Sequence, residues 1–194
     1  ERLNKFGDTT LSDTILGVAF NYACEGFFQV NIPVYEKALS DMKAWIDCNE
    51  KLPTLDLYSG VGTIGLTIGG DDVTLVEINE HAVAEMQRNI AKLNRPKTKA
   101  ILAPSEKSLE YITGEQIVIV DPPRAGLHAD VTNRLLETEP PRIIYLSCNP
   151  VTQARDVSLL QEKYEIVHHQ GYNFFPRTPH IEHLVVLDKK AREY

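Results

Sequence analysis

Short apolar runs alternate along this chain with stretches whose apolar residues recur at helical spacing. The runs predict seven strands, at 54–58, 73–77, 99–103, 116–120, 142–147, 164–169 and 183–188. The helical spacing predicts helices at 33–47, 63–68, 79–94, about 106–111, 128–137 and 150–163. Alternation of this kind is typical of a parallel sheet covered by helices on both faces. The last two strands have no helix between them and predict an antiparallel pair at the sheet edge.

The length of 194 residues leaves room for one sizeable domain and a short arm. Residues 1–26 show no clear pattern, so we expect 1–32 to be a leader and the start of the catalytic region, and 33–194 to be the catalytic domain. No apolar run approaches membrane-spanning length and no signal-peptide layout is present, which predicts a cytoplasmic protein without a membrane partner.

Net charge and cysteine content limit which partners, disulfides and metal sites the sequence can be expected to have. Twenty basic against 27 acidic residues give a net charge of −7. Because nucleic-acid-binding domains are usually basic, an RNA or DNA partner would have to be held by a local patch or by another domain. The three cysteines are far apart and form no C-x-x-C pair, so the sequence predicts neither a disulfide framework nor a metal site.

A glycine-rich loop follows the first strand of the predicted sheet. Gly60, Gly62 and Gly65 open the next helix, and Glu77 ends the next strand, an arrangement that suits any adenosine-containing cofactor. Asp56 decides between cofactors, because a carboxylate here is awkward beside a pyrophosphate but suits the ammonium of S-adenosylmethionine. The residues therefore favour S-adenosylmethionine over NAD, and no Tyr-x-x-x-Lys pair for hydride transfer is present. Glycines that serve only a tight turn are the structural alternative.

Two further strand ends carry reactive groups. Asp121-Pro122-Pro123 resembles the signature of amino-group methyltransferases, although Arg124 stands where an aromatic residue usually follows. Amino methylation needs no protein nucleophile, which makes Cys148 the deciding residue. Asn149 and Pro150 can cap and begin the following helix, so Cys148 would lie where a helix dipole favours the thiolate. An inert buried cysteine is the alternative, and it is the interpretation we keep for Cys24 and Cys48.

Five motifs in order resemble the RNA 5-methyluridine methyltransferases, which modify ribosomal or transfer RNA. They are Gly26-Phe27-Phe28-Gln29-Val30-Asn31, Asp56-Leu57-Tyr58-Ser59-Gly60-Val61-Gly62-Thr63, Val120-Asp121-Pro122-Pro123-Arg124-Ala125-Gly126, Ser147-Cys148-Asn149-Pro150 and Phe175-Pro176-Arg177-Thr178-Pro179-His180-Ile181-Glu182. The resemblance implies a Rossmann-like methyltransferase fold that binds S-adenosylmethionine. It also implies RNA-binding domains upstream that this chain lacks, which would make the chain a fragment or a truncated member.

The same resemblance assigns roles to individual residues. Cys148 would be the nucleophile, and Glu182 the base that removes the C5 proton. The residues that would contact the methyl donor are Gln29, Tyr58, Glu77 and Asp121, with Thr63 at a position that is often Asn in the family.

The chemistry explains why a thiol and a carboxylate are needed together. Uracil C5 is too weak a nucleophile to take a methyl group until a thiolate adds at C6. A carboxylate must then remove the C5 hydrogen so that the cysteine can be expelled. We therefore expect methylation of uridine C5 in structured tRNA or rRNA. The rivals are an amino-group RNA or DNA methyltransferase built on Asp121-Pro122-Pro123, and a non-catalytic module that binds the cofactor or RNA.

Some side chains keep two interpretations at this stage. Arg124, Arg155 and Arg177 could contact RNA phosphates or lower the pKa of the thiol, and each could equally be an ordinary surface arginine. Phe174 and Phe175 could stack on an extruded base or belong to the core.

Overall fold

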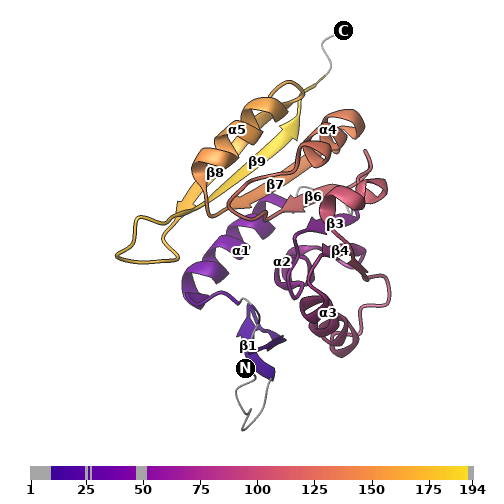
Figure 1. The fold of residues 1–194 in the computed structure, drawn as a ribbon, viewed down its shortest axis with the longest axis vertical. Helices are drawn as coiled ribbons and strands as arrows, with labels where there is room; N and C mark the ends of the chain where they lie inside the picture. The colour runs from indigo at the N-terminus through magenta and orange to yellow at the C-terminus, as the bar shows by residue number, and fades with distance from the viewer. Residues whose placement is uncertain (1–9, 25, 27, 47–51, 192–194) are drawn as a thin grey trace, which may run out of the picture.

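The computed structural model describes residues 10–24, 26, 28–46 and 52–191, which form two sheets and the helices around them (Figure 1). The strands are β1 (Thr10–Ile15), β2 (Val18–Ala23), β3 (Thr54–Leu57), β4 (Val73–Glu77), β5 (Lys99–Leu102), β6 (Ile117–Val120), β7 (Arg142–Ser147), β8 (Tyr164–Tyr172) and β9 (Glu182–Lys189). The helices are α1 (Ile32–Ile46), α2 (Thr63–Ile68), α3 (Glu80–Lys92), α4 (Ala129–Thr138) and α5 (Pro150–Leu160). None of the described helices is long and apolar enough to cross a membrane.

The large sheet has seven strands in the order β5-β4-β3-β6-β7-β9-β8. The first five are parallel, whereas β9 is antiparallel to both β7 and β8. The connection between β8 and β9 holds no helix, so the chain returns as an antiparallel neighbour. This arrangement confirms the predicted α/β fold with a seven-stranded, mostly parallel sheet and an antiparallel edge pair.

Helices cover both faces of this sheet, and successive strand residues point to opposite faces. One buried cluster joins α1, α2 and α3 to strand residues such as Ile119, Leu146 and Leu184. The other joins α4 and α5 to residues such as Val118 and Tyr145. In Figure 1, α4 and α5 lie above the sheet, and α1, α2 and α3 lie below it. The cluster that a strand residue joins therefore shows to which face of the sheet the side chains at the end of that strand point.

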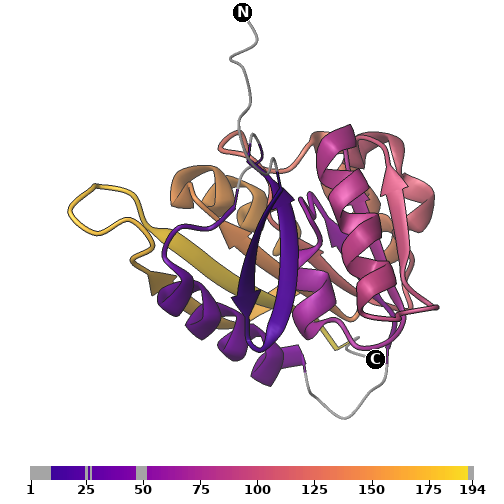
Figure 2. The same ribbon diagram turned by 90° about the horizontal axis from the view of Figure 1, so that it is seen from below.

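The expectation that residues 1–26 lack a regular element is wrong for residues 10–23. β1 and β2 form an antiparallel hairpin beside α1 and α3, visible in Figure 2. Its residues Ile15 and Phe20 are fully buried in the core cluster. The signal is weak in the sequence, because most of β1 is exposed and the turn at Leu16 and Gly17, both with positive φ, lacks the usual Asn-Gly pair.

Other predicted elements differ only in detail. The helix expected near 106–111 is two short 3₁₀ turns, η1 (Ser105–Lys107) and η2 (Leu109–Tyr111). Ser108 between them has φ of −123°, which interrupts a continuous helix. β8 runs on to Tyr172, beyond the predicted end at residue 169.

Candidate active site

Strand alternation brings the candidate side chains to one face at one edge of the sheet. Leu55 and Leu57 pack under α4 and α5, so Asp56 between them faces α1 and α2. The same alternation, continued one residue past each strand, puts Asp121 after Ile119 and Cys148 after Leu146 on that face. β9 runs in the opposite direction, so its first residues lie at the edge where the parallel strands end. Glu77 on β4 and Glu182 on β9 project from the same face by the same alternation.

The glycine loop is held from two sides by carboxylates. The Gly65 amide donates to Asp56 Oδ2 at 2.8 Å, and the Gly60 amide donates to Glu77 Oε2 at 2.9 Å. Gly62, which caps α2, has a φ of 86°, and a Cβ there would lie 2.9 Å from a Leu66 methyl carbon. α2 lacks a side-chain cap at Gly62, so Asp56 satisfies one of its first amide groups. This bracing role of Asp56 was not predicted.

Two donor-contact candidates adjoin the loop. Tyr58 has a φ of 63°, a left-handed conformation that is strained for an aromatic residue and is often kept at functional sites. Burial raises the pKa of its phenol. Thr63 begins α2 and is buried, and its side chain opposes the rise in the pKa of Tyr35.

Three carboxyl groups act on one another at the ends of β3, β6 and β9. Burial raises the pKa of Asp56 to about 7, although the Gly65 amide opposes the shift. Burial raises the pKa of Asp121 well above its usual value, and the charges of Glu182 and Asp56 add to the effect. Burial also raises the pKa of Glu182 to about 7. Such a group of carboxyls favours a bound cation, because a positive charge would offset the cost of ionising them.

Tyr35 on α1 is buried close to these three carboxyl groups, and the sequence did not predict its place in the site. It is 3% exposed, and burial together with the charges of Asp121, Asp56 and Glu182 raises its pKa. Within α1 its spacing is that of any core residue, so the sequence offers no signal for this position.

Cys148 and Glu182 lie next to the last pair of the β7–β9 ladder. That pair is Ser147 with His183, and Cys148 follows Ser147 directly while Glu182 directly precedes His183. Glu182 is only 4% exposed, which excludes a solvated loop acid. Burial raises the pKa of the Cys148 thiol, and the charges of Glu182 and Asp121 raise it further. The expected lowering by a helix dipole is therefore outweighed in the ligand-free chain, although Asn149 does cap α5 and Pro150 does occupy its first turn.

Arg124 is the cation that opposes these shifts. It lowers the pKa of both Cys148 and Glu182 and lies 3.5 Å from the His180 ring. Its backbone carbonyl accepts hydrogen bonds from Asn149 Nδ2 at 3.0 Å and Thr152 Oγ1 at 3.1 Å, which fix the Asp121–Pro123 loop to the start of α5.

The other residues with two interpretations now have defined surroundings. Arg155 bonds to its neighbour Asp156 and to the Ala125 carbonyl rather than to the thiol. Phe174 is fully buried against Tyr35, with ring centroids 5.7 Å apart, so it belongs to the core. Phe175 packs against the same core while remaining partly exposed. Of the two cysteines interpreted as buried and inert, Cys24 is exposed, so its predicted burial is wrong, and Cys48 lies outside the described residues.

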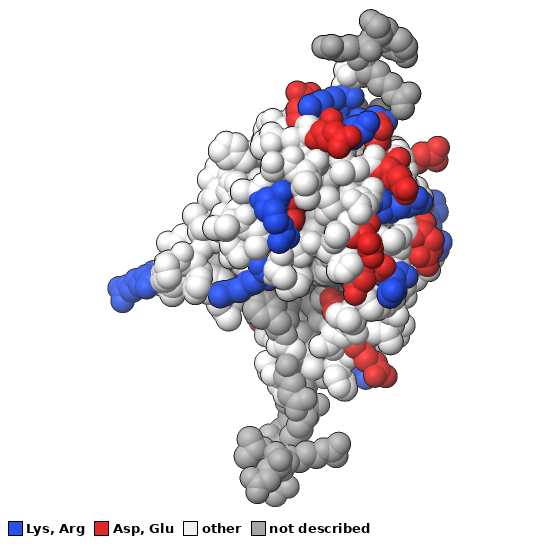
Figure 3. All heavy atoms as spheres, turned by 45° about the horizontal axis from the view of Figure 1, so that its top comes forward, with Lys and Arg blue, Asp and Glu red and all other residues white. Residues whose placement is uncertain are grey.

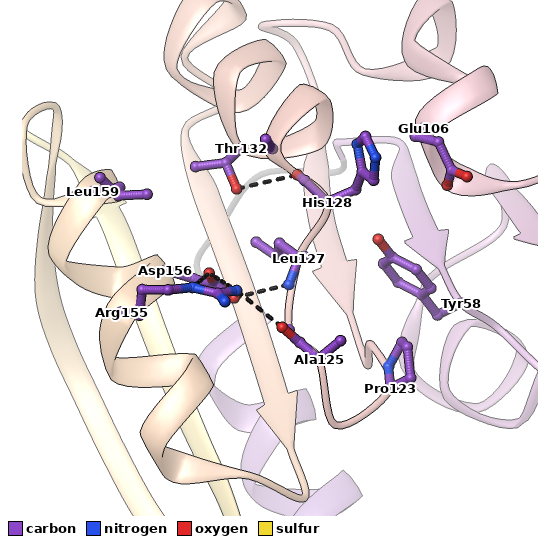
Figure 4. Close-up of a pocket in the computed structure, with 12 residues that line it drawn as sticks. Tyr58, Glu106, Pro123, Ala125, Leu127, His128, Thr132, Arg155, Asp156 and Leu159 are labelled. Carbon is purple, nitrogen blue, oxygen red and sulfur yellow. Dashed lines mark hydrogen bonds and ion pairs between the residues drawn. The ribbon is translucent and has the colours of Figure 1, made fainter.

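A hollow of about 450 Å³ lies beside the loop that follows β6, on the side of that loop toward α4 and α5 (Figure 4). Tyr58, Glu106, Pro123 and His128 surround it at one end, and Asp156 closes it at the other. Asp156 Oδ2 accepts hydrogen bonds from the Leu127 amide and the Tyr145 hydroxyl, both at 2.8 Å. Asp56, Glu77, Asp121, Glu182 and Cys148 are not among its lining residues, and Tyr58 is the predicted donor-contact residue that lines it.

Surface charge is unevenly distributed around the site. On the face in Figure 3, acidic side chains gather toward one side, and the opposite side ends in a basic tip. The 173–181 loop projects on that side in Figure 1, and Arg177 is its basic residue. A polyanion would therefore meet less repulsion from the side of this loop than from the acidic side.

Comparisons with known proteins agree with this geometry. Residues 107–190 match the tRNA (uracil-5-)-methyltransferase family model. An uncharacterized RNA methyltransferase of Enterococcus faecalis is 38% identical over 191 residues, which cover 94% of this chain and 42% of that protein. A crystal structure of Pyrococcus abyssi tRNA (uracil-54, C5)-methyltransferase in complex with S-adenosyl-L-homocysteine superposes with a TM-score of 0.83 and 33% identity, covering 94% of this chain and 45% of that one. The chain is therefore similar to RNA methyltransferases, and residues 107–190 are similar to the tRNA (uracil-5-)-methyltransferase domain.

Two further findings bear on this similarity. The chain spans about two-fifths of the length of the relatives it matches, so the activity of a whole family member does not follow from this part alone. The fold is also shared with the tRNA m1G37 methyltransferase of M. jannaschii, at a TM-score of 0.70 and 16% identity. The target atom must therefore be argued from the side chains at the strand ends.

Proposed function

We propose that this chain is the catalytic domain of an enzyme that transfers a methyl group from S-adenosylmethionine to C5 of a uridine in structured RNA. The placement of Cys148 and Glu182 beside the last β7–β9 pair, where the charge of Glu182 acts on the thiol, carries the proposal. A thiol and a carboxyl group on neighbouring strand ends could supply the nucleophile and the base that uracil C5 methylation requires. Amino methylation would need neither of them.

The described residues fit this methyl donor. Gln29 Oε1 and Asp56 Oδ1 are buried acceptors without a partner, and both could accept hydrogen bonds from an ammonium group. Glu77 keeps further lone pairs for ribose hydroxyls after its bonds to Gly60 and Asn79. The carboxyl group of Asp121 favours the positive sulfonium. The ring of Tyr58 and the hollow beside it offer apolar surface for an adenine. When bound, the donor supplies an electrophilic methyl group.

The catalytic sequence follows from the residues. The Cys148 thiolate bonds to C6 of the uracil, and the electron pair of the C5–C6 double bond makes C5 nucleophilic. C5 then takes the methyl group. Glu182, as a carboxylate, removes the proton from C5, the double bond re-forms, and the C6–sulfur bond breaks to return the thiolate. Arg124 assists by favouring the ionised forms of both groups.

Two observations bear on which class of RNA the protein would methylate and how it would bind it. The Pyrococcus abyssi protein acts on uracil 54 of tRNA by its description, which supports a tRNA target, and rRNA is the second class. A net charge of −7 is unfavourable for RNA affinity, so recognition would depend on Arg124, Arg177 and other parts of a longer protein.

The test is product analysis. The natural full-length form of the protein is incubated with S-adenosylmethionine labelled on the methyl group and with total RNA, which is then digested to nucleosides. The proposal predicts label in 5-methyluridine. Label in a methylated amino group of adenosine, guanosine or cytidine would favour the amino-group alternative, and the absence of label in all nucleosides would favour a non-catalytic module.

A further inference from the structure

Gln153 on α5 joins the two strands that carry Cys148 and Glu182. Its Nε2 donates to the Tyr145 carbonyl of β7 and the His183 carbonyl of β9, both at 2.9 Å. Its Oε1 lies 2.6 Å from Nδ1 of the His183 ring. Gln153 is 1% exposed, so these bonds are made without competition from water.

The hydrogen-bonding pattern fixes the orientation of the Gln153 amide and the position of the proton on the His183 ring. Two carbonyl oxygens can only accept, so the nitrogen of the Gln153 amide must face them and its oxygen must face the ring. The His183 Nδ1 must therefore carry a proton. Burial and the neighbouring His169 lower the pKa of His183, which favours the neutral ring protonated at Nδ1.

The end of β7 at Cys148 and the start of β9 at Glu182 differ in the other contacts that hold them in place. The Cys148 end continues into α5. There the backbone N–H of Asn149 donates to Ser147 Oγ, and the side-chain Nδ2 of Asn149 donates to the Arg124 carbonyl. The Glu182 end follows the projecting 173–181 loop. Gln153 reaches that end one residue away from Glu182, on the opposite face of β9.

We infer that Gln153 is a positioning residue, which acts through the β9 backbone at His183 to hold the Glu182 carboxylate where it can remove the C5 proton. This inference rests on the proposed function. It separates two steps: thiolate addition and methyl transfer depend on Cys148, and only the release of product depends on Glu182.

A fluorinated substrate isolates the first of these steps. In a tRNA transcript made with 5-fluorouridine, C5 carries fluorine instead of hydrogen. Cys148 can still add at C6 and C5 can still take the methyl group, but no C5 proton is left for a base to remove. The adduct therefore accumulates whether or not Glu182 is in place. An ordinary uridine transcript requires both steps.

The experiment compares Gln153→Leu with Gln161→Leu, the same change at an exposed position just beyond α5. With full-length protein and S-adenosylmethionine, Gln153→Leu should form the fluorinated adduct at close to the normal rate. On the uridine transcript it should turn over about tenfold or more slowly, since complete loss of a general base typically costs about 10² to 10⁴. Methylated adduct should accumulate. His183→Leu should have a smaller effect, because both bonds from Gln153 to backbone carbonyls remain, and Gln161→Leu should have none.

The inference is overturned if Gln153→Leu slows adduct formation and turnover equally, as a general loss of fold would, or changes neither. Binding of S-adenosylhomocysteine, measured by calorimetry, separates these cases, because it should stay normal in a folded variant. If Gln153→Leu does not fold, Gln153→Met carries the test, because it keeps the length of the side chain and loses both bonds to the backbone carbonyls: an unchanged turnover rate overturns the inference. Failure of the unaltered protein to form any fluorinated adduct would instead overturn the proposed covalent function, and the inference with it.

Discussion

Cys148 and Glu182 flank the Ser147–His183 pair, the last pair of the β7–β9 ladder, from the same side. The charge of Glu182 raises the pKa of the Cys148 thiol, so the two side chains are close enough to act on one substrate ring. The proposed nucleophile and base are thus both anchored next to one strand pair, which is more rigid than placement on two independent loops. The reversed order of the last two strands has a direct chemical consequence, because it brings the start of β9 to the edge where β7 ends.

The stability of the ligand-free chain should fall as the pH rises from about 4 to 7. Burial raises the pKa of Asp56 and of Glu182 to about 7, so the folded chain keeps protons that the unfolded chain has already released in this interval. The free energy of unfolding therefore decreases with increasing pH. Asp56→Asn, which keeps an acceptor for Gly65, should make this decrease less steep in thermal unfolding series. Asp71→Asn, at an exposed site, should leave it unchanged, and an equal slope for both variants would contradict the assignment.

Cofactor affinity should depend on Glu77. Glu77→Ala removes the acceptor for the Gly60 amide and for ribose hydroxyls. Hydrogen bonds to a charged group are worth about 1.5 to 3 kcal/mol, so the Kd for S-adenosylhomocysteine should rise about 10- to 100-fold by calorimetry. Glu80→Ala, three positions later and exposed, is the matched control. Unchanged affinity in Glu77→Ala, or binding of NAD by the unaltered chain, would show that the glycine loop has been misinterpreted.

A buried side-chain amide on α3 should contribute to the stability of the β1–β2 hairpin. Asn89 Oδ1 accepts from the Asn21 amide at 2.8 Å, and its Nδ2 donates to the Asn21 carbonyl at 3.1 Å. Asn89→Ala should cost about 1 to 3 kcal/mol of unfolding free energy, because buried groups are left unpaired. The Asn21 amide should also exchange faster with solvent deuterium. Gln87→Ala, on the exposed side of α3, should do neither. Unchanged protection of Asn21 in the Asn89 variant would contradict this coupling.

Periodicity predicted the large sheet well because its central strands, β3, β6 and β7, are buried on both faces. Continuous apolar runs such as Ile117–Val120 are typical of strands in that environment. The hairpin at 10–23 was missed because its burial rests on two residues, Ile15 and Phe20, in otherwise half-exposed strands. A pattern of period 2 needs several buried positions to be visible in a sequence.

Asp56, Glu77, Asp121 and Cys148 were noted at predicted strand ends. Gln29, Tyr58, Thr63 and Glu182 came from the family resemblance. The electrostatics of these side chains were not predicted. The sequence pointed to a thiolate at Cys148 from the following helix, but the opposing effects of Asp121 and Glu182 depend on which strands become neighbours. Tyr35 and Gln153 were missed for the same reason. Both lie on helices at positions typical of packing, and their contacts exist only once α1 and α5 cover the sheet. The roles of Cys148, Glu182 and the donor-contact residues remain predictions.

The central claim is that Cys148 acts before methyl transfer and Glu182 after it. Full-length protein bearing Cys148→Ala or Glu182→Gln is incubated with S-adenosylmethionine and a uridine transcript, then resolved on a denaturing gel. The Cys148 variant should give neither 5-methyluridine nor a protein–RNA band. The Glu182 variant should methylate once and then stall as a covalent band, since removal of a general base typically costs about 10² to 10⁴ in rate. Normal turnover by Glu182→Gln, or 5-methyluridine made by Cys148→Ala, would contradict the account.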